Sequence, residues 1–210
     1  ALLQDTNHRI GNSLATVSSL LALQLMRTRS SEVRSALEAA RLRVHAIASA
    51  HRRLRLGDDL ESASADEFLS AVLEDIEATQ TDGGRIRIKG SIEPIVVSAR
   101  DATTVGILVG ELVTNALKHA FPDKRSGQIE VALFRDEDDT VVLRVADDGV
   151  GLDEPQDEAG ESGLGSVIVR QLAGQFGGEP RYAPGSNGGL VITIQLPTLG
   201  KPLGAEAGRG

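Results

Sequence analysis

The chain has 210 residues, enough to build two compact units that each bury a core. Hydrophobic residues make up 40% and charged residues 25%, which is typical of folded globular proteins and excludes disordered and fibrous classes. The net charge of −8 is of the wrong sign for a protein that binds nucleic acid, and 2% aromatic residues leave little to stack on bases. The absence of cysteine excludes disulfides and thiolate chemistry and fits a reducing cytoplasm. No apolar run approaches the ~20 residues of a membrane-spanning helix, so we expect no membrane contact by this segment.

The first 57 residues are predicted to form two helices. From Ile10, apolar residues recur at steps of three and four, which predicts a helix to about Arg29 with one buried stripe. Residues 33–54 continue this alternation as a heptad pattern. We expect an antiparallel hairpin over residues 1–57 whose apolar stripes favour pairing of two hairpins into a four-helix bundle. Because the chain begins inside a helical pattern, we expect that it was cut from a longer protein.

A second unit is predicted after a linker at residues 58–63. Ser64 and Glu67 have the spacing of a helix capping box ahead of an apolar helical stretch. Paired strands between helices, rather than strict alternation, predict an α+β sandwich with helices on one face over residues 64–197. A Gly- and Ala-rich tail at residues 198–210 is expected to be disordered. The predicted strands are 86–89, 95–98, 129–135, 141–146, 179–182 and 191–196, and the predicted helices are 101–119 and 164–176.

Glu111, Asn115, Lys118 and His119 form a polar stripe on the predicted helix 101–119. On spacing alone, a solvated helix face explains this stripe as well as a ligand site does. The ligand alternative is that an amide and a carboxylate hold a hydrated Mg²⁺ while Lys118 or His119 meets phosphate oxygens.

Two Gly-rich stretches follow a predicted strand, at residues 147–151 and 163–165. Such glycines belong to ordinary turns more often than to ligand sites. Their order here also suits a nucleotide, because a carboxylate at a strand end can accept from an exocyclic amine and a helix N-terminus favours phosphate. Gly185 and the pair Gly188–Gly189 are predicted to form a simple hairpin turn.

These motifs resemble a known family. E-L-V-T-N-A-L-K-H-A at residues 111–120, D-D-G-V-G-L at 147–152 and G-L-G-S-V-I-V at 163–169 are similar to the N, first-glycine and second-glycine boxes of the Bergerat-type ATPase domain. Histidine kinases, gyrase, Hsp90 and MutL share that domain. Residues 5–24 resemble the phosphoacceptor helix of the second histidine-kinase dimerisation subclass. The resemblance covers roughly residues 5–197 and implies the catalytic core of a sensor histidine kinase.

In the dimerisation helix, the resemblance implies that His8 is the phosphoacceptor. Asp5 is the carboxylate available to orient or deprotonate the imidazole, and Asn12 could position a water for the reverse phosphatase reaction. Asn7 and Gly11 depart from the family pattern, and a glycine inside a helix costs about 1 kcal/mol relative to alanine.

In the ATPase domain, the resemblance implies a site for ATP and Mg²⁺. Asn115 would bind the metal with Glu111 as its polar partner, and Asp147 would contact the adenine amine. Gly149 and Gly151 would admit the base and ribose, and Lys118 and His119 would meet the phosphates. A lid over the phosphates would contain Gly163, Leu164 and Gly165. Thr193 would face the adenine.

The resemblance therefore implies a cytoplasmic, homodimeric kinase that phosphorylates its own His8 and passes the phosphoryl group to an aspartate in the receiver domain of a response regulator. Two alternatives stay open. One is a serine kinase of the anti-sigma type, which uses a similar ATP domain but does not need the hairpin. The other is a histidine phosphotransfer or scaffold protein that has lost ATP binding.

Overall fold

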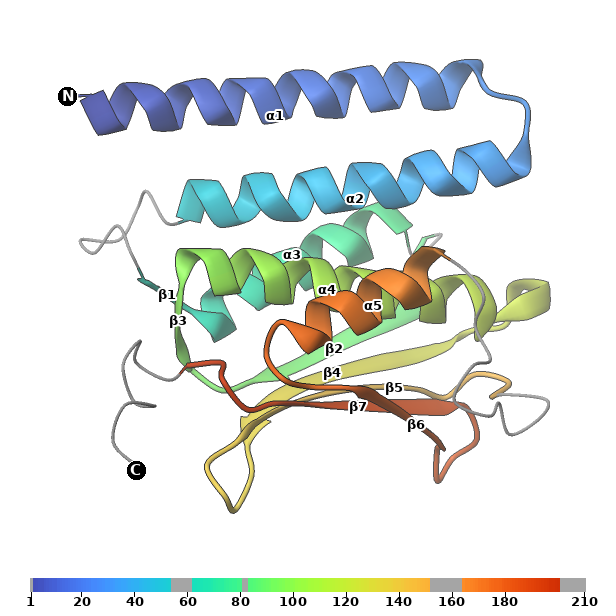
Figure 1. The fold of residues 1–210 in the computed structure, drawn as a ribbon. Coiled ribbons are helices and arrows are strands. Elements are labelled where there is room, and N and C mark those ends of the chain that lie inside the picture. The colour runs from blue at the N-terminus through green and yellow to red at the C-terminus, as the bar shows by residue number, and fades with distance from the viewer. Residues whose placement is uncertain (1, 54–61, 81–82, 152–163, 201–210) are drawn as a thin grey trace, which may run out of the picture.

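The computed structural model describes residues 2–53, 62–80, 83–151 and 164–200. A helical hairpin comes first and a mixed unit of helices and strands follows (Figure 1). The elements in chain order are α1 (Leu2–Arg27), α2 (Ser31–Arg53), β1 (Ser62–Ser64), α3 (Ala65–Gln80), β2 (Ile86–Ile92), β3 (Val96–Ser98), α4 (Ala99–His119), the 3₁₀ turn η1 (Pro122–Lys124), β4 (Gly127–Arg135), β5 (Val141–Asp147), α5 (Leu164–Gly174), β6 (Pro180–Pro184) and β7 (Leu190–Leu196).

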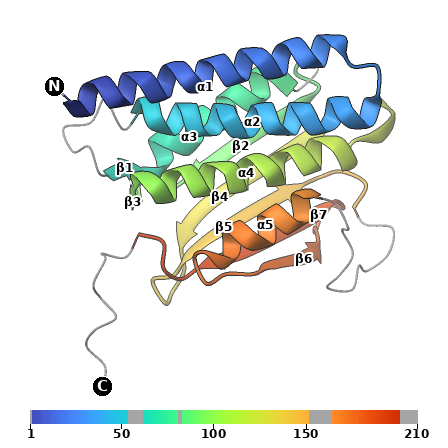
Figure 2. The ribbon, with the colours of Figure 1, turned by 45° about the horizontal axis from the view of Figure 1, so that its top comes forward.

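The second unit is a five-stranded sheet with helices on one face. The strand order is β2-β4-β5-β7-β6, in which β2 and β4 run parallel and the other neighbours run antiparallel. α3, α4 and α5 cover one face of this sheet, with α4 between the other two (Figure 2). β1 and β3 form a separate antiparallel pair. The structure thus confirms the α+β sandwich that the sequence predicts.

The core lies between the sheet and this helix layer. Residues on alternate positions of the strands face the helices, because successive side chains of a strand point to opposite faces. On β4 the buried residues are Ile129, Val131 and Leu133, each at most 1% exposed. β7 shows the same alternation with Ile192, Ile194 and Leu196. Across the strands, Val131 is paired with Val145 and Val145 with Ile192, so one apolar row crosses the sheet.

α4 is the central helix of the layer, and its ends are well defined. Ser98 caps its N-terminus, since the Ser98 hydroxyl oxygen accepts the backbone N–H of Asp101 at 3.1 Å. The helix ends before Phe121 and Pro122, where proline can no longer continue the ladder of helical hydrogen bonds. The polar stripe and the buried apolar residues of α4 therefore lie on one helix whose two ends are fixed.

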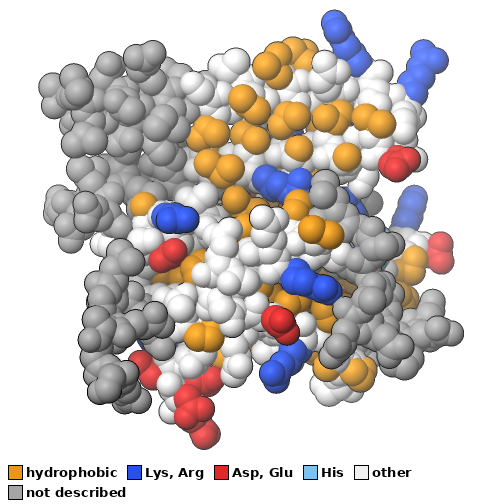
Figure 3. Space-filling view, in the orientation of Figure 1, with side chains coloured by type: hydrophobic (Ala, Val, Ile, Leu, Met, Phe, Trp, Pro, Cys, Tyr) orange, Lys and Arg blue, Asp and Glu red, His pale blue; other side chains and the backbone are white. Residues whose placement is uncertain are grey.

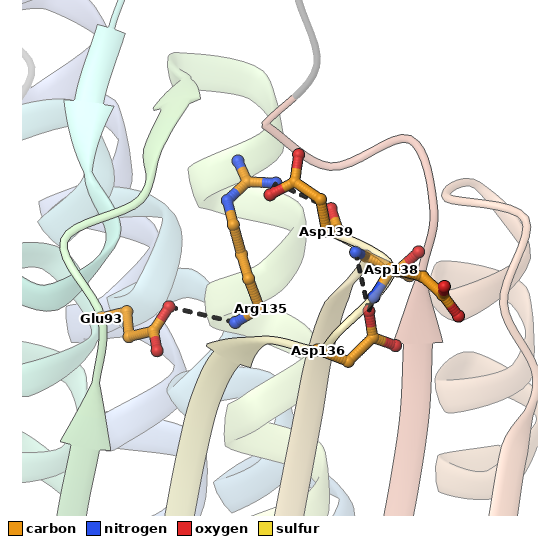
Figure 4. Close-up of polar contacts among 6 residues, drawn as sticks. Glu93, Arg135, Asp136, Asp138 and Asp139 are labelled. Carbon is orange, nitrogen blue, oxygen red and sulfur yellow. Dashed lines mark hydrogen bonds and ion pairs between the residues drawn. The ribbon is translucent and has the colours of Figure 1, made fainter.

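The turn between β4 and β5 is built by acidic residues that bind backbone (Figure 4). The Asp136 carboxylate accepts the N–H groups of Asp138 and Thr140 at 3.1 and 2.9 Å. Asp139 adopts a left-handed φ of 59°, and its carbonyl accepts from the Arg135 guanidinium at 3.0 Å. This acidic run is therefore explained by the turn it stabilises.

Two local predictions differ from the structure. The strand β1 was not expected, because its three residues carry no hydrophobic alternation and it exists only through pairing with β3. α3 begins at Ala65 as predicted, but the Ser64 hydroxyl donates to the carboxylate of Asp66 rather than forming a box with Glu67.

The predicted disorder from residue 198 onward is corrected for residues 198–200. Leu199 is 1% exposed and belongs to the core, and the Thr198 N–H donates to the Phe176 carbonyl at 3.3 Å. An apolar side chain that fills the end of the core outweighs the Gly-rich composition around it. Residues 201–210 lie outside the described part of the chain.

The hairpin lies on the mixed unit through its second helix. α2 packs against α1 on one side and against α4 and α3 on the other (Figures 1 and 2). α1 instead leaves apolar side chains in solvent, and these gather over the hairpin in Figure 3. The exposed set comprises Val17, Leu20, Leu23 and Met26 on α1 and Val33 on α2. None of the helices in the described ranges is both long and apolar enough to cross a membrane.

Candidate functional site

A cavity opens between α4 and the sheet, at the end of β5. Helix α4 forms one wall, and β5, β7 and the edge strand β6 form the other. Most of the lining is apolar, and an amide, an imidazole, a carboxylate and a phenol are its polar side chains. The lining residues are Leu112, Asn115, Ala116, His119 and Ala120 from α4, Val145, Asp147 and Gly151 from β5 and its loop, and Tyr182, Leu190 and Ile192 from β6 and β7.

Asp147 is the carboxylate of this cavity, and its orientation is fixed by backbone. Its Oδ1 accepts the N–H of Gly149 at 2.9 Å and that of Leu190 at 3.3 Å. Since both bonds use Oδ1, Oδ2 is the oxygen that they leave for a ligand. Burial raises the pKa of the Asp147 carboxyl above its ordinary value, against the lowering effect of these two N–H groups. The cavity can therefore offer an oriented acceptor to an exocyclic amine.

Two glycines make the cavity possible by allowing backbone segments to touch. A Cβ on Gly149 would lie 2.3 Å from the Ala120 carbonyl oxygen, where the loop after β5 meets the end of α4. A Cβ on Gly189 would lie 2.0 Å from the Asp147 carbonyl oxygen, and Gly189 has a φ of +74°. Gly149 is thus required by packing, and Gly151 is the residue of its loop that lines the cavity. The predicted hairpin turn at Gly185 and Gly188–Gly189 is confirmed, since it joins β6 to β7 and the Gly185 N–H donates to the Gly189 carbonyl at 3.1 Å. Gly189 also lies directly against Asp147.

The four polar residues of the α4 stripe separate into different environments. Asn115 and His119 line the cavity. Lys118 is exposed and is not among the lining residues. Adjacent residues of a helix point about 100° apart, so Lys118 and His119 cannot both face the same ligand from the same direction.

The Glu111 side chain bonds to Arg43 on α2 and is not among the residues that line the cavity. Its Oε1 accepts from Nε of Arg43 at 2.5 Å, and its Oε2 accepts from the terminal guanidinium nitrogen at 2.8 Å. Asn115 fits the role of a Mg²⁺ ligand because its amide lines the cavity, whereas Glu111 does not fit while Arg43 occupies both oxygens. Within the described ranges, no group of three or more His, Asp or Glu side chains could hold a metal by itself. Mg²⁺ commonly takes one or two protein oxygens and completes its shell with water and phosphate.

Thr193 is placed away from the cavity. It lies between Ile192 and Ile194, which face the helices, so its side chain is on the outer face of the sheet beside its strand partners Arg144 and Arg181. The expectation that Thr193 contacts adenine does not fit this placement. Leu190 and Ile192 are the β7 residues that line the cavity.

Several predicted site residues have side chains outside the described part of the structure. Asp5, His8 and Asn12 are on α1, but their side chains lie outside the described part of the structure. Gly163 also lies outside it, and Leu164 and Gly165 are described only as the first residues of α5.

Two contributions to the site were missed by sequence reasoning. Tyr182, the single tyrosine of the chain, lines the cavity from the edge strand β6, opposite Ile192 in the strand register. Asp148 holds the loop after β5 in place. Its Oδ1 accepts the Gln128 N–H at 2.7 Å, and its carbonyl accepts from the Arg125 guanidinium at 3.0 Å. The alternation of β6 could have indicated the face of Tyr182, but no local pattern connects Asp148 with Gln128.

Two family models match the chain, and together they cover the hairpin and the site. Residues 5–80 match the model described as "Histidine kinase", and residues 100–200 match "Histidine kinase-, DNA gyrase B-, and HSP90-like ATPase". The chain belongs to the histidine kinase family. The resemblance seen in the sequence is thereby confirmed, and the cavity between α4 and the sheet lies in the ATPase-like part of this histidine kinase core.

Named relatives and solved structures agree with this assignment. The histidine kinase core is 30% identical over 198 residues to "Blue-light-activated histidine kinase 2" of Erythrobacter litoralis, covering 93% of this chain and 56% of that protein. It is 31% identical over 199 residues to "Sensor histidine kinase PdtaS" of Mycobacterium tuberculosis, covering 94% of this chain and 39% of that protein. The chain thus spans roughly half or less of the length of these curated relatives.

The solved histidine kinase domain of the EL346 blue-light-activated kinase from Erythrobacter litoralis has the same overall fold. Its TM-score is 0.70 at 26% identity, and the match covers 92% of this chain and 94% of that one. The catalytic domain of the histidine kinase ThkA shares the fold at a TM-score of 0.54 and 23% identity, over 65% of this chain and 95% of that one.

Proposed function

We propose that this histidine kinase core binds ATP in the cavity between α4 and the sheet and transfers its γ-phosphoryl group to His8. The observation that carries the proposal is the pairing of Asp147 on the sheet with Asn115 on α4 across one cavity, in a chain that also matches a histidine kinase model over residues 5–80. Asp147 supplies an oriented carboxylate for the adenine amine, and Asn115 supplies an amide oxygen at the phosphate side.

The transfer is a displacement at phosphorus. A neutral ring nitrogen of His8 forms a bond to the γ-phosphorus while the bond from phosphorus to the β–γ bridging oxygen breaks, and the electron pair leaves with ADP. The imidazole then loses its ring proton, for which Asp5, three residues earlier on α1, is the proposed acceptor or orienting group. Mg²⁺, held through Asn115, would supply charge neutralisation at the phosphates.

The remaining contacts follow the same assignment. Gly151 lies beside the ribose and base, and His119 meets the nucleotide from α4. Gly163, Leu164 and Gly165 are proposed to cover the phosphates at the N-terminus of α5, where backbone N–H groups favour negative charge. The phosphoryl group of His8 then passes to an aspartate of a response-regulator receiver domain, and Asn12 positions water for its hydrolytic removal. Because ATP is the proposed phosphoryl donor, we expect the kinase core to act in the cytoplasm.

We also propose that the kinase is a homodimer through the hairpin. α2 is covered by α1 and α4, but the stripe that contains Leu20 and Met26 is 57% and 75% exposed at these two residues. An exposed apolar stripe of this kind is typical of a helix that packs against a partner helix. A second copy of the hairpin would cover it and complete a four-helix bundle.

The test is phosphorylation with labelled ATP and Mg²⁺. The chain should acquire a label that is lost in acid and kept in alkali, His8→Ala should acquire none, and His51→Ala, on α2 of the same hairpin, should label as the unchanged chain does. Adding a receiver domain should move the label to that protein. A label that survives acid and is lost in alkali would instead identify a serine kinase. Absence of Mg·ATP binding at millimolar nucleotide would identify a scaffold protein.

A further inference from the structure

The hairpin is held on the ATP-binding unit by a two-bond ion pair. Nε and a terminal nitrogen of Arg43, on α2, donate to the two carboxylate oxygens of Glu111, on α4, at 2.5 and 2.8 Å. The Glu111 side chain is 7% exposed and that of Arg43 is 23% exposed. A carboxylate buried to this degree needs a partner, because an unpaired charge in such a place is strongly unfavourable.

The helices that carry this pair also contain buried polar atoms that lack partners. Oγ1 of Thr114, three residues after Glu111 on α4, is buried without a hydrogen-bond partner among the described residues. Nε of Arg41, two residues before Arg43 on α2, is in the same state. A buried polar atom without a partner carries a desolvation cost that other contacts of the fold must offset.

The position of the pair connects it to the proposed nucleotide site. Glu111 lies four residues before Asn115 on α4, so the two side chains are one turn apart on the same side of the helix. A divalent cation at Asn115 would attract the Glu111 carboxylate and repel the Arg43 guanidinium. Glu111 can give both oxygens to Arg43 or turn toward the cation, and it cannot do both.

The packing order of the helices gives the pair a consequence for transfer. α1, which carries His8, packs on α2, and α2 packs on α4 (Figure 1). The helix that would receive the phosphoryl group is therefore separated from α4 by the thickness of α2. Transfer of a phosphoryl group within one chain needs the two units to move relative to one another.

We propose that Arg43 is a positioning residue that clamps Glu111, holds the ATP-binding unit against α2, and releases it when Mg·nucleotide draws Glu111 away. This inference rests on the proposed ATP site, but the clamp can be measured without any phosphorylation. Binding and release are linked reciprocally, so loss of the clamp must strengthen Mg·nucleotide binding by the same factor by which Mg·nucleotide weakens the clamp.

The chain has no cysteine, so spin labels can be placed at chosen residues without removing native ones. We would introduce Ala36→Cys on α2 and Lys89→Cys on β2, both exposed, and measure the distance between the labels by double electron–electron resonance. The unchanged interface should give one narrow distribution. Arg43→Ala should broaden it, and the exchanged pair Arg43→Glu with Glu111→Arg should narrow it again. Arg43→Lys should give an intermediate result, since lysine cannot make the two parallel bonds.

Arg34→Ala is the matched control, because the Arg34 guanidinium bonds to the Thr28 carbonyl within the hairpin at 3.2 Å. It should leave the distribution narrow. A narrow distribution in Arg43→Ala would overturn the clamp, and cooperative thermal unfolding of each single variant, followed by circular dichroism, shows that it is folded. Because Arg43→Ala keeps Glu111, it should also bind a non-hydrolysable ATP analogue more tightly with Mg²⁺ and unchanged in EDTA. Equal affinities with Mg²⁺ would overturn the competition.

The two proposals fail in distinguishable ways. If the distance depends on Arg43 and Mg·nucleotide broadens it, but His8 is never labelled, the clamp stands and the proposed transfer to His8 fails. If His8 is labelled and the distance does not depend on Arg43, the proposed function stands and the clamp fails.

Discussion

Oδ1 of Asp147 accepts the backbone N–H of Leu190 at 3.3 Å, which joins the end of β5 to the start of β7 beside the cavity under α4. The same oxygen accepts from Gly149, so the carboxylate orientation depends on backbone from two loops. This arrangement separates the structural oxygen of Asp147 from the one that can meet a ligand, and a single substitution can test that separation.

Asp147→Asn should keep the fold and lose the nucleotide. The amide oxygen can still accept from Gly149 and Leu190, but an NH₂ group replaces Oδ2 and confronts the adenine amine donor with another donor. We expect ATP affinity to fall by about 10- to 100-fold, measured by calorimetry. Thr193→Val, on the opposite face of the sheet, is the control and should leave affinity unchanged. Equal loss in both variants would contradict the assignment of the cavity.

The difference in stability between the unchanged chain and Asp147→Asn should depend on pH in a defined direction. Burial raises the pKa of Asp147 above its ordinary value of 3.8, so the folded state binds this proton more tightly than the unfolded state does. The free energy of unfolding contributed by this group therefore falls as pH rises through the folded-state pKa, and the loss is complete above that pKa. Asp147→Asn should be more stable than the unchanged chain at pH 7, with an advantage that disappears toward pH 3.8. Urea unfolding at several pH values measures this, and a pH-independent difference would refute it.

Gly149→Ala should destabilise the ATP-binding unit. Its Cβ would meet the Ala120 carbonyl at 2.3 Å, and since that atom is backbone, the clash cannot be relieved by a side-chain rotation. We expect the free energy of unfolding to fall by about 1–3 kcal/mol. Gly110→Ala, inside α4 with no atom within 4 Å of the new Cβ, should instead gain about 0.5–1 kcal/mol from helix propensity. Thermal unfolding of the two variants measures both changes, and a Gly149→Ala variant as stable as the unchanged chain would contradict the predicted clash.

The dimer is tested at the exposed stripe of α1. Leu20→Glu places a charge at a residue that is 57% exposed in one copy, so it should change monomer stability by no more than about 0.5 kcal/mol while breaking a hairpin pairing. Light scattering over a range of concentrations should show a dimer for the unchanged chain and a monomer for Leu20→Glu. Val96→Glu, 64% exposed on β3, should remain a dimer. If the unchanged chain is already a monomer at all concentrations, the proposed pairing is wrong.

Most of the fold could be predicted from the sequence because its elements are regular. Steps of three and four gave both hairpin helices, and period-two alternation gave the five strands of the main sheet to within a few residues. β1 could not be predicted, because its backbone pairs with β3, more than 30 residues away along the chain. Thr193 is different, since the alternation of Ile192 and Ile194 already indicated that it faces outward.

The site was predictable where it depends on motif and not where it depends on distant contacts. Asn115, His119, Asp147 and Gly151 belong to the sequence boxes and line one cavity, while their contacts to a nucleotide stay predictions. Glu111 belongs to the same box but binds Arg43, 68 residues earlier, and neither residue carries a local pattern that indicates this pairing. Gly149 was assigned to the ligand, whereas its close approach to Ala120 became visible only when the end of α4 and the loop after β5 were placed together.

Leu199 has a practical consequence for anyone who shortens or extends this chain. Its side chain is 1% exposed and belongs to the hydrophobic core, so a polypeptide that stops at Pro197 would lose part of that core and leave a cavity. A stop codon after Gly200 would keep the Leu199 side chain in the core. The boundary at which the ATP-binding unit can be cut is thus set by one leucine that follows the last strand, and not by the end of the strand itself.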